Sequence, residues 1–141
     1  MSKDEEQSTK PIRNWPPESE RLFEQMIALW NEGKVEDALQ IGDQLIKLEP
    51  ESAAVNGIIG MIHLDSKQPK IAIGFCEKAV AKSPRSELAS LGLFHSLWSA
   101  EAINQAMDEI QRFICANPAS EIYDEIIAEI KDKWDEDLRN D

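Results

Sequence analysis

The sequence has few cysteines and no long apolar run. Its two cysteines, Cys76 and Cys115, lack the CxxC spacing of zinc and redox sites and are typical of a reducing compartment. No stretch approaches the ~20 consecutive apolar residues of a membrane-spanning helix. Residues 1–6 are too polar and acidic for a signal peptide. We therefore expect a cytoplasmic protein that needs no membrane, no metal and no other cofactor.

Positive charge is also scarce. The 15 Lys and Arg residues face 27 Asp and Glu residues, which gives a formal net charge of −12. A surface of this sign repels phosphate backbones, so nucleic acid is excluded as the expected partner and a basic protein segment is favoured. The 141 residues, of which 42% are hydrophobic, suffice for one domain with its own core.

The chain does contain an internal sequence repeat. Pro50, Pro84 and Pro118 recur every 34 residues, the length of one helix-turn-helix repeat. Three alanines keep the same interval, Ala38, Ala72 and Ala106. The period predicts an all-α solenoid, a class of protein that usually holds another macromolecule and performs no chemistry.

The proline and apolar patterns divide the chain. Residues 1–17 form a polar, acidic leader that we expect to be flexible, ending in paired prolines, and Ser19 is the expected N-cap of the first helix. A single domain is expected over residues 18–138. Its parts are three helical hairpins and a capping helix with a polar outer face, at residues 19–52, 53–86, 87–120 and 121–138.

With these features the chain resembles the tetratricopeptide repeat (TPR) family from about residue 19 to 134. The family's small site on the second helix is filled in every unit, by Ala38, Ala72 and Ala106. Gly60 and Ala128 fill the small site of the first helix, which Met26 and Phe94 occupy elsewhere. In the first unit Gly33 matches the family's turn glycine. In the second and third units Lys67 and Glu101 stand at that position and do not match it. The aromatic signature is eroded, with Gly42, Cys76 and Ile110 where Tyr or Phe is usual.

The resemblance implies an α-α superhelix whose concave side binds a partner protein. Carried over to this sequence, the expected partner-binding residues are Phe23, Ile27, Trp30, Met61, Leu64, Asp65, Leu88, Leu91, His95, Trp98, Glu125, Glu129 and Asp132. This lining is apolar along three helices and acidic at the last, so it favours an amphipathic segment with basic residues at one end. We expect a monomer or a weak homodimer.

Two alternatives concern the apolar lining. Trp30 and Trp98 belong either to the groove or to the core, and the segment from Trp15 to Pro17 either stays outside or folds back over the groove. One version of the family grips the acidic tails of chaperones with Lys, Asn and Arg. At the corresponding positions this chain carries Phe23, Ile27, Ile58, Leu88 and Gly92, so that assignment is rejected.

Catalytic motifs are not found. His63 falls at a core position of the family, where a packed imidazole with one hydrogen-bonded nitrogen is expected, and His95 faces the groove without a metal-ligand neighbour in sequence. We therefore expect that the protein is not an enzyme. The alternative is an enzyme that uses His95 in the concave cleft. The size and acidity of the chain resemble those of immunity proteins that neutralise a toxin domain, and those of secretion chaperones that hold an exported protein.

Overall fold

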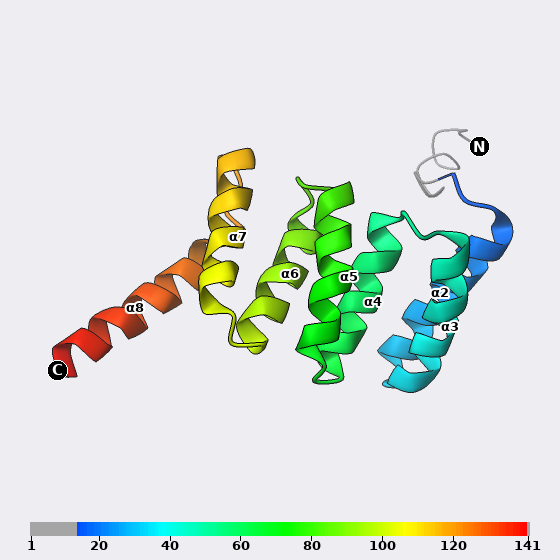
Figure 1. Cartoon of the computed structure of the whole chain (residues 1–141), viewed down its shortest axis with the longest axis horizontal. Helices are drawn as coiled ribbons and strands as arrows, with labels where there is room; N and C mark the ends of the chain where they lie inside the picture. Colours follow the sequence, from blue (N-terminus) through cyan, green and yellow to red (C-terminus); the bar gives the residue numbers. More distant parts are fainter. Residues whose placement is uncertain (1–13, 141) are drawn as a thin grey trace, which may run out of the picture. The chain divides into compact units, whose positions relative to one another are not determined.

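The computed structural model describes residues 14–140, so most of the leader expected over residues 1–17 lies outside the described residues. Within that range the regular structure is entirely helical, as expected (Figure 1). The helices are α2 (Pro17–Asn31), α3 (Val35–Leu48), α4 (Ala53–Asp65), α5 (Pro69–Lys82), α6 (Glu87–Ser99), α7 (Ile103–Ala116) and α8 (Asp124–Asn140). They form two compact units: α2 and α3 belong to one, which ends at Pro50, and α4 to α8 belong to the other, which starts at Glu51.

The first unit is a single helical hairpin that begins one turn earlier than the sequence suggested. Pro16 is the N-cap of α2 and Pro17 is its first residue, where a missing backbone N–H costs nothing. Ser19 is therefore not the cap. Its side chain is buried, and its hydroxyl donates a hydrogen bond to Glu49 Oε2 at 2.7 Å, which links the start of α2 to the end of α3.

The second unit contains two complete hairpins, α4 with α5 and α6 with α7, and then α8. Ser52 and Ser86 are the N-caps of α4 and α6; each hydroxyl accepts a hydrogen bond from a backbone N–H three residues on, at 3.2 Å. The first hairpin crosses closely at Gly60, because a Cβ atom there would lie 2.6 Å from Cys76 Sγ and 3.3 Å from the carbonyl oxygen of Ala72. The small residues that define the repeat thus mark real close contacts.

The three hairpin turns share one geometry although only one contains glycine. Gly33, Lys67 and Glu101 have positive φ angles of 79°, 61° and 64°. In each turn the next residue's N–H donates to the carbonyl four residues before the turn residue, at 2.9 Å in every case. Because Glu101 forms the third turn, α7 begins two residues later, at Ile103. The 34-residue register therefore fixes the turn even where the side chain strains it.

The outer face of α8 departs from the expected polar cap. Trp134 is 67% exposed and Leu138 is 61% exposed, among otherwise charged neighbours. Within residues 14–140, no helix is both long and apolar enough to cross a membrane.

Gly60→Ala and Gly74→Ala should change stability in opposite directions. The first substitution places a methyl group against Cys76 and should cost about 1–3 kcal/mol through overpacking. The second adds a methyl group in α5 with nothing within 4 Å, and should stabilise the helix by about 0.5–1 kcal/mol. Urea unfolding followed by circular dichroism measures both. Equal effects of the two substitutions would show that α4 and α5 do not cross this closely.

Glu101→Gly should raise stability by up to about 1 kcal/mol, because glycine adopts the positive φ of 64° without strain. Gln111→Gly, at an exposed position inside α7, is the matched control and should cost about 1 kcal/mol. Thermal unfolding of the two variants checks the sign. A loss of stability for Glu101→Gly would contradict a left-handed turn at this residue.

Candidate partner-binding site

A pocket of about 190 Å³ opens between α6 and α8 in the second unit. Its lining residues are Phe94, His95 and Trp98 from α6, and Ile126, Glu129, Ile130 and Lys133 from α8. The two residues of α6 that lie on its open side, His95 and Trp98, are exposed, whereas Phe94 is 3% exposed. The pocket thus has an apolar floor and a rim that carries one carboxylate and one ammonium group.

Helix α6 has apolar residues on two of its faces, one packed in the core and one on the open side of the unit. One face buries Ala89, Leu93 and Leu97. The other carries Leu88, Leu91, His95 and Trp98, and Leu88 is 70% exposed. Residues spaced three and four apart share one helix face, so these side chains form one stripe that leads into the pocket. Met61 of α4 lies beside it, since its Cγ is 3.8 Å from the position of a Cβ on Gly92.

Aromatic rings form the floor of the pocket. The Phe94 ring lies 5.7 Å from that of Trp98, 5.2 Å from the imidazole of His95 and 5.7 Å from the ring of Tyr123, measured between centroids. These are typical spacings of attractive ring pairs. Partial removal from water beside these rings lowers the pKa of His95 below its ordinary value, so at pH 7 most of the imidazole is neutral.

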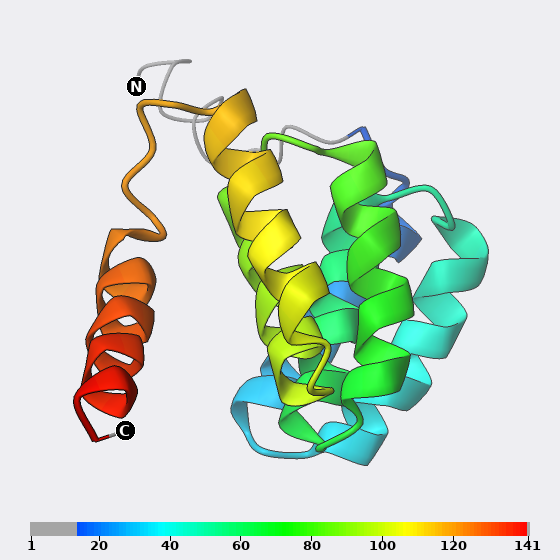
Figure 2. The same ribbon diagram turned by 60° about the vertical axis from the view of Figure 1, so that its left-hand side comes forward.

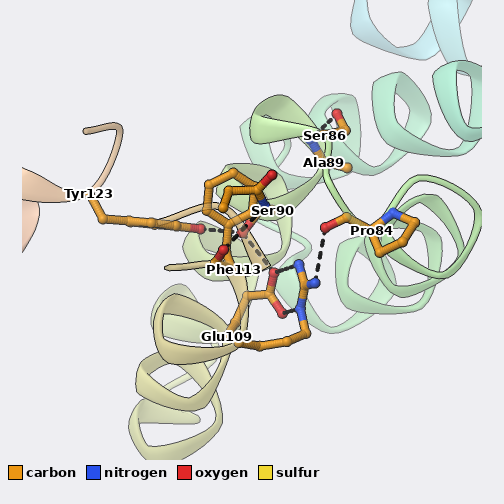
Figure 3. Close-up of polar contacts among 9 residues, drawn as sticks. Pro84, Ser86, Ala89, Ser90, Glu109, Phe113 and Tyr123 are labelled. Carbon is orange, nitrogen blue, oxygen red and sulfur yellow. Dashed lines mark hydrogen bonds and ion pairs between the residues drawn. The ribbon is translucent and has the colours of Figure 1, made fainter. Parts of the chain in front are cut away.

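A buried chain of hydrogen bonds fixes the start of α8, as Figure 3 shows. The Tyr123 hydroxyl donates to Ser90 Oγ at 2.6 Å, and Ser90 Oγ donates to Glu109 Oε2 at 2.7 Å. The Glu109 carboxylate also accepts two bonds from Arg112, at 2.7 and 2.6 Å, and Arg112 donates to the carbonyl oxygen of Pro84 at 3.0 Å. Ser90, Glu109 and Tyr123 are all at most 6% exposed. The buried carboxylate of Glu109 is therefore compensated by hydrogen bonds and by the charge of Arg112.

Tyr123 is held by apolar contacts as well. Its ring packs edge-on against Phe94 and Phe113, with centroids 5.7 and 5.8 Å apart. Removal from water raises the pKa of Tyr123 to about 12, because the phenolate would be poorly solvated there. The residue just before α8 is thus bound to both helices of the third hairpin.

The pocket brings together three of the residues expected from the sequence, namely His95, Trp98 and Glu129. The side chain of Trp98 is 39% exposed and lines the pocket. Leu88 and Leu91 share its helix face, while Met61 and Leu64 are half-buried on α4 and Asp65 is exposed at its end. Glu125 and Asp132 are exposed on α8 without lining the pocket.

Four of the lining residues are absent from the expected set of partner-binding residues: Phe94, Ile126, Ile130 and Lys133. The spacing of Ile126 and Ile130, four residues apart on a helix, is a signal that places both on the side of Glu129 and Lys133. Phe94 carried no such signal, because a residue at the small site of the repeat is expected to contact only the helix that follows.

In the first unit, Phe23 is not an exposed groove residue. It is 9% exposed, and the ring of Trp15 packs edge-on against it at 5.3 Å. The segment before the paired prolines thus does fold back onto α2 at this point. Ile27 and Trp30 are half-buried.

His63 behaves as a packed imidazole, as expected. Its ring stacks on Phe75 at 5.5 Å, and its Nδ1 shares a hydrogen bond of 2.9 Å with Gln68 Oε1. Among the residues that the structure describes, no group of three or more His, Cys, Asp or Glu side chains is arranged to hold a metal ion.

Comparisons with known proteins identify the fold. No family model matches the sequence, and a search of curated proteins also finds no match. A structure of MamA from Desulfovibrio magneticus RS-1, which comprises residue 41 to the end of that protein, superposes with a TM-score of 0.72 at 25% identity; the match covers 83% of this chain and 66% of that one, so this chain spans about two thirds of the length of the MamA chain it matches. The Sgt2 TPR domain from Aspergillus fumigatus gives a TM-score of 0.75 at 19% identity, covering 88% of this chain and 83% of that domain.

A third similar structure contains a ligand. The second TPR domain of human RPAP3, in complex with the HSP70 peptide SGPTIEEVD, gives a TM-score of 0.69 at 16% identity and covers 78% of this chain and 92% of that domain. The chain therefore has the fold of the tetratricopeptide repeat domains, and the expected all-α superhelix of such hairpins is confirmed.

The phenol of Tyr123 should lose its proton near pH 12, and the free energy of unfolding should fall as it does so. Its folded pKa of about 12 exceeds the value near 10 of an unfolded chain, so its contribution is complete below about pH 10 and is lost as the pH rises through 12. Tyr123 is the chain's only tyrosine, so the ultraviolet absorbance of phenolate reports it alone. Titration near pH 10 in the folded protein would show that this ring is solvated.

Proposed function

We propose that this protein is a non-catalytic interaction module, which holds an apolar and partly basic segment of a partner protein along α6 and in the α6/α8 pocket. The observation that carries the proposal is the stripe from Leu88 to Trp98, which ends in a pocket with an aromatic floor. The similar TPR domain of RPAP3 holds a peptide, which supports peptide binding as the use of this fold.

The stripe supplies the driving force. Leu88 and Trp98 are 70% and 39% exposed, an unusual placement for large apolar side chains that lie on one helix face. At ~25 cal/mol per Å² of apolar surface, covering a few hundred Å² yields several kcal/mol before the costs of ordering the ligand. The neutral imidazole of His95 adds to this apolar character at pH 7.

The charges favour a basic ligand. Glu125, Glu129 and Asp132 are exposed on α8, and the whole chain carries a formal charge of −12. These carboxylates attract Lys or Arg beside the apolar residues of a segment and speed its association at low salt. An acidic peptide such as SGPTIEEVD meets the opposite conditions here, because Leu88 and Gly92 stand at the positions where a carboxylate-binding clamp needs cations.

Of the two roles that the size and acidity of the chain suggest, the site favours holding a segment. A pocket of about 190 Å³ can admit one side chain of an extended chain, as a secretion-type chaperone requires. An immunity protein covers a folded toxin domain, and subnanomolar affinity for a folded basic domain would favour that role instead. His95 is proposed as a wall of the pocket and not as a catalytic base.

Panning a random peptide library on the immobilised protein tests the proposal. Recovered peptides should combine large apolar residues with Lys or Arg. Trp98→Ala and Leu88→Ser should each weaken their binding by roughly tenfold or more, since aromatic and central contacts dominate such interfaces. Ile71→Ser, which changes an exposed apolar side chain on α5 outside the pocket, is the matched control and should leave their affinity unchanged.

Two results would contradict the proposal. One is the enrichment of acidic peptides, which the charge of α8 disfavours. The other is a large drop in melting temperature for Trp98→Ala with peptide binding intact, because that ring would then serve the core and not the surface.

A further inference from the structure

A second apolar surface lies on the other side of α8. Among residues 14–140, four of the eight exposed large apolar side chains lie on the last two helices: Ile103 and Met107 on α7, and Trp134 and Leu138 on α8. Their concentration at one end of the second unit is unlike the single exposed apolar residues that are common on protein surfaces.

Part of this surface is hollowed. A groove of about 320 Å³ lies between α7 and α8 and is lined by Met107, Ile127, Ile130, Lys131, Trp134 and Asp135. It shares only Ile130 with the α6/α8 pocket, so the two hollows open on different sides of α8. We name it the α7/α8 groove.

The repeat shows what usually fills such a groove. In the preceding hairpin the corresponding face of α6 is closed by α7, and Leu93, Phe94 and Leu97 are each at most 7% exposed. One repeat later on α8, Ile127 is only half-buried, and Ala128 and Lys131 are exposed. Figures 1 and 2 show α8 as the last helix of the described residues, with no later helix packed against it. The place of the second helix of a fourth hairpin is therefore open.

We propose that the α7/α8 groove takes an amphipathic helix from a partner protein, with an apolar stripe flanked by Lys or Arg, which stands where that second helix would lie. The apolar stripe covers Met107, Ile127 and Trp134. A helix bound in this way completes the fourth hairpin from outside the chain, at a surface distinct from the one that holds the segment in the proposed function.

The charge of α8 selects this occupant over a second copy of the chain. Between Asp124 and Arg139 the helix carries seven carboxylates and three cationic side chains. A second copy would bring the same acidic helix against it, and like charges at such a distance are repelled. A helix with cations on its flanks gains from the same carboxylates, of which Asp135 lines the groove and Glu136 and Asp137 follow it in the sequence of α8.

The test uses a synthetic, Ala-rich helical peptide of about 20 residues, which carries Leu at i, i+3, i+4 and i+7 spacing and Lys on both flanks. A control peptide has every Lys replaced by Glu. Fluorescence anisotropy with the full chain measures the affinity of each. The measurement is made in the Leu88→Ser background, so that the α6 stripe of the proposed function does not compete for the peptide. Trp134→Ser and Met107→Ser are the groove variants, and Ile71→Ser on α5 is the matched control. All four residues are exposed, so the variants should fold, and circular dichroism verifies that they do.

The Lys peptide should bind at least roughly tenfold tighter than the Glu peptide, and each groove variant should weaken its binding roughly fivefold or more while Ile71→Ser does not. Absence of binding overturns the proposal, as does binding that Trp134→Ser leaves unchanged. A dimer of the free protein that Trp134→Ser dissociates in sedimentation overturns it too, because the groove would then hold a second copy. None of these results depends on whether Trp98 binds a segment.

Discussion

The burial of one phenol determines where α8 lies. Tyr123 precedes that helix and is bound twice to the third hairpin, by its hydrogen bond to Ser90 and by its ring contacts with Phe94 and Phe113. The hydroxyl has a protein partner because an unpaired one would be costly in this core, and the chain of bonds continues to Glu109 and Arg112. Side chains of both helices of the hairpin thus position the element that follows them.

Both proposed binding surfaces depend on that placement. Helix α8 forms one wall of the α6/α8 pocket through Ile126 and Glu129, and one wall of the α7/α8 groove through Ile127 and Trp134. Because these residues lie on neighbouring sides of the same helix, which meet at Ile130, a rotation of α8 about its axis would change both hollows together. The seven carboxylates of α8 would favour cationic partners at both proposed surfaces.

The periodic features were predictable from the sequence, because each depends on contacts inside one repeat. The alanines at the crossings, such as Ala72, and the turns at positions 33, 67 and 101 follow the 34-residue register even where Glu101 replaces glycine. Features that depend on one particular neighbour were missed. Ser19 looked like a cap but is buried against Glu49, and Phe23 looked exposed but lies under Trp15. The α6/α8 pocket belongs to this second kind, since it needs the position of α8.

The position of the single tyrosine ring is the most direct test of this account. Nuclear Overhauser contacts of the Tyr123 ring protons can be measured in the free protein, because no other tyrosine signal overlaps them. Contacts to the ring protons of both Phe94 and Phe113 are the predicted result, given centroid distances of 5.7 and 5.8 Å. A Tyr123 ring with the chemical shifts of a free peptide and no contact to either phenylalanine would contradict the placement of α8 and the two surfaces that depend on it.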